Sequence, residues 1–142
     1  TPLEVEVMDR NMLFCDGENQ TLYVGNLRVD TADLSVKGRF DRDGWVVGVD
    51  SLHPENHRYL LVSKKRGAMK DPMLVEYDSS NQATRFWTLP SVLSITPSVV
   101  FDFQNKVFYT GGFESSFVEK YSLSSGKDVN ANARNENVPN AR

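Results

Sequence analysis

The chain has 142 residues, of which 39% are hydrophobic and 25% are charged, and its formal net charge is -3. This composition is typical of one globular domain, and the small negative charge excludes bulk electrostatic attraction to nucleic acid or anionic lipid. No apolar run approaches the roughly 18 residues that a transmembrane helix requires, so we predict a soluble chain without a membrane span.

Short strands separated by polar turns dominate the chain. Residues 3–7 alternate between apolar and acidic side chains, which is typical of a half-buried strand. Three similar units follow, and each begins with an apolar strand that ends in aspartate, then a polar turn and a second apolar strand. These pairs of strands are predicted at 12–16 with 22–25, at 46–50 with 59–62, and at 99–102 with 107–112.

Later strands complete the units. They are predicted at 34–40, 73–77, 83–89 and 117–123, and residues 128–129 are the only candidate for a fourth strand in the last unit. No segment keeps a 3.6-residue apolar period for three turns, so we predict an all-β fold. The asparagine-rich residues 130–142 are predicted to form a flexible tail.

The spacing of the units indicates their architecture. Asp16, Asp50 and Asp102 each end a first strand, and they lie 34 and 52 residues apart. The mean spacing matches a four-stranded β-propeller blade of about 40–50 residues. We therefore predict antiparallel blade repeats of a partial β-propeller, with a single antiparallel β-barrel or sandwich as the alternative. The repeats are placed at about 11–40, 45–90 and 98–129, and residues 1–10 are predicted to give a strand to a preceding or shared blade.

Particular residues resemble the kelch family of propeller repeats. The strand at 107–112 ends in two glycines and is followed by Tyr121. This order is similar to a kelch blade, in which a glycine pair ends one strand and a tyrosine closes the next. Segments 73–78 and 87–90 resemble the second half of the same motif.

The resemblance covers about residues 11–129, and the first two units depart from it. They carry Gly25-Asn26 and Ser63-Lys64 in place of the glycine pair. Their strands at 22–24 and 59–62 are equally similar to propeller repeats of the Tyr-Val-Thr-Asn type. Known propellers close with at least about four blades, so three units predict a piece of a longer propeller or a ring completed by self-association or by another chain segment.

Two histidines, His53 and His57, lie four residues apart. On a helix, this spacing would place both imidazoles on one face as metal ligands. Pro54 makes the segment a turn, and the chain has no further histidine. We therefore predict a solvated loop, with no bound metal and no cofactor.

The recurring aspartates Asp16, Asp50 and Asp102 have two interpretations. They could converge as an acidic site, or each could accept backbone N–H groups as a turn cap. Recurrence at the end of the same strand favours the turn cap.

The single cysteine, Cys15, lies in an apolar stretch and cannot form an internal disulfide. We predict a buried, unreactive thiol. Such a thiol is compatible with a reducing compartment, cytoplasmic or nuclear.

The densest charge cluster lies in the longest connection of the second unit, and the equivalent connection of the third unit carries two aromatic residues. Connections on a rigid scaffold often carry binding specificity, and we place the segment at 28–33 on the same rim. The predicted binding residues are Lys64, Lys65, Arg66 and Lys70 in the first connection and Phe113, Glu114 and Phe117 in the second.

The chain lacks a coherent set of catalytic residues, so we predict a non-catalytic scaffold that binds a protein partner or another ligand through its loops. The alternative function is a propeller-type hydrolase that acts on a glycan or lactone through Asp16, Asp50 or Asp102. Fold analogy alone does not choose between these functions, because propellers host many unrelated activities.

Overall fold

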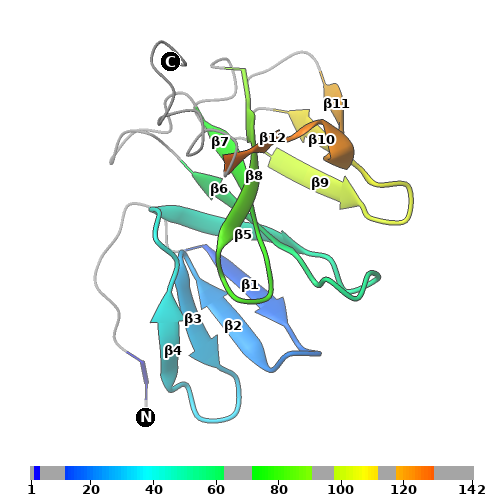
Figure 1. Ribbon diagram of the computed structural model, residues 1–142. Coiled ribbons are helices and arrows are strands. Elements are labelled where there is room, and N and C mark those ends of the chain that lie inside the picture. The colour runs from blue at the N-terminus through cyan, green and yellow to red at the C-terminus, as the bar shows by residue number, and fades with distance from the viewer. Residues whose placement is uncertain (1, 4–11, 63–71, 91–97, 112–117, 130–142) are drawn as a thin grey trace, which may run out of the picture.

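The computed structural model describes residues 2–3, 12–62, 72–90, 98–111 and 118–129 (Figure 1). These residues form three antiparallel sheets, none of which closes on itself. The all-β prediction is therefore confirmed. The alternative of a single closed barrel is wrong, because none of the three sheets closes. The predicted strand at 3–7, apart from Leu3, and the tail at 130–142 lie outside the described residues.

Each sheet is a meander in which consecutive strands pair side by side. The first sheet has the order β1 (Leu13–Asp16), β2 (Thr21–Val24), β3 (Leu27–Asp30) and β4 (Val36–Arg39). The second sheet has the order β5 (Gly44–Val49), β6 (Arg58–Val62), β7 (Met73–Tyr77) and β8 (Ala83–Thr88), with β12 (Lys127–Asp128) beyond β8. The third sheet consists of β9 (Ser98–Asp102), β10 (Val107–Gly111) and β11 (Glu119–Ser122).

The second sheet is buried on both faces. On one face, Leu61, Leu74 and Trp87 join a core cluster that contains Phe108 of the third sheet. On the other face, the apolar residues of β6 and β7 that alternate with those of the first cluster join a second cluster, which contains Tyr23 of the first sheet. Because successive side chains of a strand point to opposite faces, the nearly continuous apolar runs of β6 and β7 supply both clusters.

The first strands of the three sheets lie next to one another. Strand β5 contacts β1 on one side and β9 on the other, and Figure 1 shows β5 between them. The other strands of each meander follow outward from this edge. The three sheets are therefore stacked with their first strands toward a common region.

Contact between the second and third sheets depends on a glycine. A Cβ atom at Gly48 would lie 2.6 Å from the Phe101 ring. That ring is held in place, since it stacks on Phe103 at 4.9 Å between ring centres and contacts Tyr59 at 4.7 Å. The absence of a side chain at Gly48 thus lets an aromatic ring of β9 approach the backbone of β5.

Two strands differ from the predictions. Segment 28–33 was predicted to be a rim loop, but its first three residues belong to β3. This strand is only four residues long with two apolar residues, and Gly25 in the left-handed region (φ 59°) makes a tight turn before it.

The predicted fourth strand of the third unit instead joins the second sheet as β12, which pairs with β8. After β11, the short 3₁₀ turn η2 (Leu123–Ser125) redirects the chain. The indole N–H of Trp87 donates to the carbonyl of Ser122 at 3.3 Å and to Oγ of Ser125 at 3.2 Å. A Cβ atom at Gly126 would lie 2.6 Å from the same indole. Trp87 therefore anchors the returning chain beside β8.

The prediction for Cys15 is also wrong, because this thiol is exposed. Strand β1 directs Asp16 inward, and Leu13 and Cys15 point to the face of the first sheet that lies away from the second. An apolar neighbourhood in the sequence therefore does not bury this residue.

We predict that Gly48→Val lowers the free energy of unfolding by about 1–3 kcal/mol, because the new side chain must displace the Phe101 ring from a packed cluster. Urea unfolding followed by tryptophan fluorescence measures the change. Gly17→Ala is the matched control, because a Cβ atom there meets no atom within 4 Å. Equal effects of the two substitutions would show that the close approach at Gly48 does not matter for stability.

Candidate functional site

The three recurring aspartates cap the first turn of each sheet with the same hydrogen bonds. Each carboxylate accepts the backbone N–H of the residue three positions later and also contacts a side-chain nitrogen of that residue. For Asp16 the partner is Asn19, at 3.4 and 2.7 Å; for Asp50 it is His53, at 3.2 and 2.7 Å; for Asp102 it is Asn105, at 3.2 and 2.7 Å. The turn-cap interpretation is therefore confirmed.

A second cap recurs where the third strand of each sheet ends. Oδ1 of Asp30 accepts from the backbone N–H of Ala32 at 2.8 Å, and Oδ1 of Asp78 accepts from Ser80 at 2.9 Å. In the third sheet, Oγ of Ser122 takes this position and accepts from Ser124 at 3.2 Å. Because alternate connections of a meander return to the same end of the sheet, both capped turns of each sheet lie at one end.

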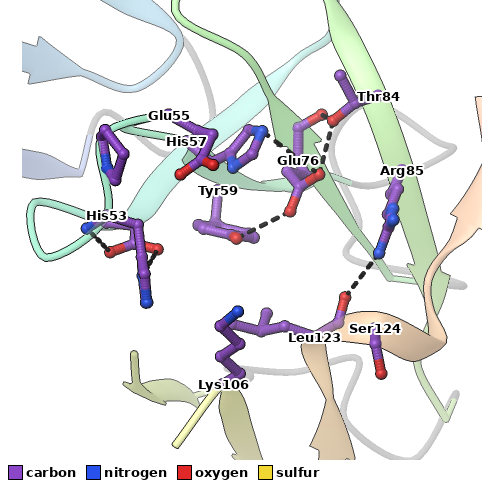
Figure 2. A pocket seen from close by; sticks show the side chains of 12 residues that line it. His53, Glu55, His57, Tyr59, Glu76, Thr84, Arg85, Lys106, Leu123 and Ser124 are labelled. Carbon is purple, nitrogen blue, oxygen red and sulfur yellow. Dashed lines mark hydrogen bonds and ion pairs between the residues drawn. The ribbon is translucent and has the colours of Figure 1, made fainter. Parts of the chain in front are cut away.

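A cleft of about 560 Å³ lies at this end between the second and third sheets (Figure 2). The second sheet contributes the turn between β5 and β6 and residues of β6, β7 and β8. The third sheet and the segment that follows it contribute Lys106, Leu123 and Ser124. The volume falls within the range of small-molecule sites, which is about 300–1,000 Å³.

Glu76 is one of two buried acidic residues of the cleft, and Asp50 is the other. The Glu76 carboxylate accepts a hydrogen bond from the Tyr59 hydroxyl at 2.8 Å and another from the Thr84 hydroxyl at 2.7 Å. Burial, followed by the charge of Glu76, raises the pKa of Tyr59 well above its usual value. The phenol therefore remains a hydrogen-bond donor that holds the carboxylate in place.

Both histidines line the cleft beside a carboxylate. His53 Nδ1 lies 2.7 Å from Asp50 Oδ2, and His57 Nε2 lies 3.9 Å from Glu76 Oε1. The two imidazoles are half-buried, with 30% and 26% of their side chains exposed. The loop was predicted to be solvated, but it places two imidazole–carboxylate pairs at one cavity. Among the residues that the structure describes, no group of three or more His, Cys, Asp or Glu side chains could hold a metal ion.

Two charged residues that line the cleft, Glu55 and Lys106, are exposed. Neither side chain has an ion pair or hydrogen bond to the described part of the chain. Lys106, which follows Asn105, has a left-handed backbone conformation with φ 56°. The carbonyl of Lys106 accepts a hydrogen bond from the backbone N–H of Leu123 at 2.9 Å. This bond fixes the backbone that presents the ammonium group.

A second cation, Arg85 of β8, borders the cleft and donates to the carbonyl of Leu123 at 3.3 Å. Figure 2 shows Arg85 and Lys106 on either side of Leu123. The cleft therefore combines carboxylates of the second sheet, which hydrogen bonds hold in place, with two cationic side chains beside Leu123.

The predicted binding residues remain a prediction. Lys64, Lys65, Arg66, Lys70, Phe113, Glu114 and Phe117 all lie outside the described residues. Of the three recurring aspartates, only Asp50 lines the cleft. The sequence analysis missed Glu76, whose one signal is that it is the only charged residue in the otherwise apolar strand β7.

Comparison of the chain with protein-family models, with curated proteins and with solved structures finds no match. Within the described ranges, no helix has the length and apolar character that crossing a membrane requires.

We predict that Tyr59 and Glu76 are coupled. In a double-mutant cycle of Tyr59→Phe and Glu76→Gln, the coupling free energy should be about 1–3 kcal/mol, because the hydrogen bond is buried and one partner is charged. Urea unfolding measures each variant. The matched control is the more exposed pair of Tyr121 and Glu119, whose hydroxyl and carboxylate oxygens lie 2.6 Å apart. Coupling at Tyr59 no larger than at this pair would contradict the assignment of a buried network.

The turn cap at Asp102 predicts a pH dependence. The side-chain amide of Asn105, followed by its backbone N–H, holds the pKa of Asp102 below the usual 3.8. Because the pKa is lower in the folded state, the ionised carboxylate stabilises the fold above about pH 4, and this contribution is lost as the pH falls through the folded-state value.

Melting temperatures between pH 2 and pH 7 test this dependence. Asp102→Asn should melt below the wild type at pH 6, and the difference should shrink toward zero at pH 2. Asp43→Asn is the control, because Asp43 accepts no hydrogen bond from the described residues. A difference that persists at pH 2 would show that Asp102 acts through something other than its charge.

Proposed function

We propose that the chain is a non-catalytic binding scaffold built from β-propeller-type repeats of the kelch-like kind, and that it takes a small polar ligand in the cleft between its second and third sheets. The observation that carries the proposal is the pair of oppositely charged side chains on the walls of that cleft, Glu55 and Lys106, which make no ion pair or hydrogen bond with the described residues.

Three features support the propeller part of the proposal. Each sheet is a meander, the first strands of successive sheets are in contact, and each sheet carries the same two turn caps. Repeats of this kind are expected when four-stranded blades surround a central axis.

The charge arrangement supports a ligand that bears both an ammonium and a carboxylate group. Glu55 comes from the second-sheet turn, and Lys106 comes from the third-sheet turn. A zwitterion such as an amino acid or a dipeptide can pair with both side chains at once, and the hydroxyl-held Glu76 offers a second acceptor for its ammonium group. The cleft volume suits a molecule of this size.

A hydrolase is the second candidate, since Asp50 and Glu76 both line the cleft and each lies beside an imidazole. The scaffold is favoured because the oxygens of Asp50 are engaged by the turn and those of Glu76 by Tyr59 and Thr84. Carboxylates that are committed to structural hydrogen bonds are poorly placed to exchange protons with a substrate.

Binding of a protein partner is a prediction separate from the binding of a small ligand in the cleft. The basic run of Lys64, Lys65, Arg66 and Lys70 and the aromatic connection with Phe113 and Phe117 remain candidates for that contact. A scaffold that presents loops from rigid sheets can bind a protein through these connections and a small molecule in the cleft.

We predict that glycylglycine binds in the cleft. In an NMR titration, the backbone amide signals of His53, His57 and Lys106 should shift in a saturable manner. Glu55→Gln and Lys106→Gln should each weaken binding by up to about fivefold, which corresponds to one solvent-accessible ion pair.

Glu18→Gln and Lys127→Gln are the charge-matched controls at residues that do not line the cleft, and they should leave the affinity unchanged. Equal weakening by cleft and control variants, or no saturable shift, would contradict the binding proposal. Hydrolysis of aryl glycosides or lactones that disappears in Asp50→Asn, with an unchanged melting temperature, would instead favour the hydrolase.

A further inference from the structure

A tyrosine recurs at the same register position in all three sheets. Tyr23 pairs with Phe14, Tyr59 with Gly48, and Tyr109 with Val100. In each case the paired residue lies two positions before the capping aspartate. The three tyrosines therefore occupy equivalent places, and we call the face that carries them the following face of each sheet.

The next sheet buries this tyrosine in the first two cases. Tyr23 is 1% exposed and belongs to the cluster shared with the second sheet. Tyr59 is also 1% exposed and contacts Phe101 of the third sheet. Tyr109 is 38% exposed. The third sheet thus presents a position that its two sister sheets bury.

The rest of that face has the same character. Lys120 pairs with Tyr109, just as Glu76 pairs with Tyr59. Val118 lies two residues before Lys120, and Leu74 lies two residues before Glu76, so Val118 and Leu74 occupy equivalent positions. Leu74 is 0% exposed, whereas Val118 is 72% exposed, and Val100 is 61% exposed. Three apolar side chains, Tyr109, Val118 and Val100, are therefore exposed together on the following face of the third sheet.

The opposite half of such an interface lies on the first sheet. The residue directly before the capping aspartate is Cys15 in the first sheet, Val49 in the second sheet and Phe101 in the third sheet. Val49 packs in the cluster shared with the preceding first sheet, and Phe101 packs against the preceding second sheet. Cys15 is exposed, as is Leu13 at 68%. The exposed part of this face is confined to β1, because Leu27 and Val29 on β3 are already buried and Leu22 and Val24 on β2 are half-buried.

We infer that the following face of the third sheet in one copy binds the exposed β1 strand of the first sheet in a second copy, through the positions at which β5 and β9 meet within one chain. This inference rests on the proposed propeller-type arrangement. Both halves of the contact are present on the same chain, so two copies can form it twice and close a ring of six sheets. Six lies within the 4–8 blades that propellers contain.

The internal interface assigns the facing residues. Gly48 and Tyr59 of the second sheet both lie against Phe101. By register, Val100 and Tyr109 take the places of Gly48 and Tyr59, and Cys15 takes the place of Phe101. Cys15 of one copy therefore lies against Val100 and Tyr109 of the other.

Two measurements test the dimer. Light scattering of the wild type should give twice the chain mass of 16.0 kDa, and Tyr109→Asp should shift the mass to that of one chain without a change in far-UV circular dichroism. Val100→Cys should form a disulfide with Cys15 of the other copy under mild oxidation, visible as a dimer on a non-reducing gel.

Leu52→Cys is the matched control for cross-linking, because Leu52 is 65% exposed and lies in a turn away from this face. It should remain monomeric on the gel, as should Val100→Cys combined with Cys15→Ser. The inference would be overturned if light scattering gave the wild type the mass of one chain or an open series of larger oligomers. Equal cross-linking through a cysteine at position 52 would also overturn it. If the protein has the mass of one chain and still binds glycylglycine, the dimer inference is wrong and the proposed binding function stands.

Discussion

The burial of both faces of the second sheet is the constraint on which the rest of the structure depends. Strands β6 and β7 carry apolar side chains of both parities, so this sheet needs a neighbour on each side to keep these residues from water. The aromatic rings of Tyr59, Trp87 and Phe108 fill one side, and Tyr23, Phe40 and Tyr77 fill the other.

Stacking of the sheets also creates the cleft. Each meander returns its capped turns to the same end, so the second and third sheets bring two sets of turns together there. The turns are rigid because carboxylate and hydroxyl caps satisfy their backbone N–H groups. The cleft therefore joins rigid turns, held by Asp50 and Asp102, to the side chains of Glu55 and Lys106, which make no hydrogen bond or ion pair within the described part of the chain.

Sequence patterns predicted most strands within one or two residues, because apolar runs bounded by turn formers are local signals. The strand β7 was predicted at its observed bounds. Strand β3 was missed because it is short and half polar. Cys15 was placed inside because its neighbours are apolar, yet it lies on the face of β1 opposite to Phe14 and Asp16 and is exposed there. The pairing of β12 with β8 depends on the contact of Gly126 with Trp87, which lies 39 positions earlier in the chain.

The sequence by itself determined the features that act over a few residues: the period-two strands and the aspartate caps, in which donor and acceptor lie three positions apart. Only the tertiary structure decided which side chains share the cleft. Tyr59, Glu76 and Lys106 come from different strands and turns of two sheets, and their proximity follows from how the sheets stack. Stacking results from the shape and burial of whole faces, so a local pattern of residue types cannot specify it.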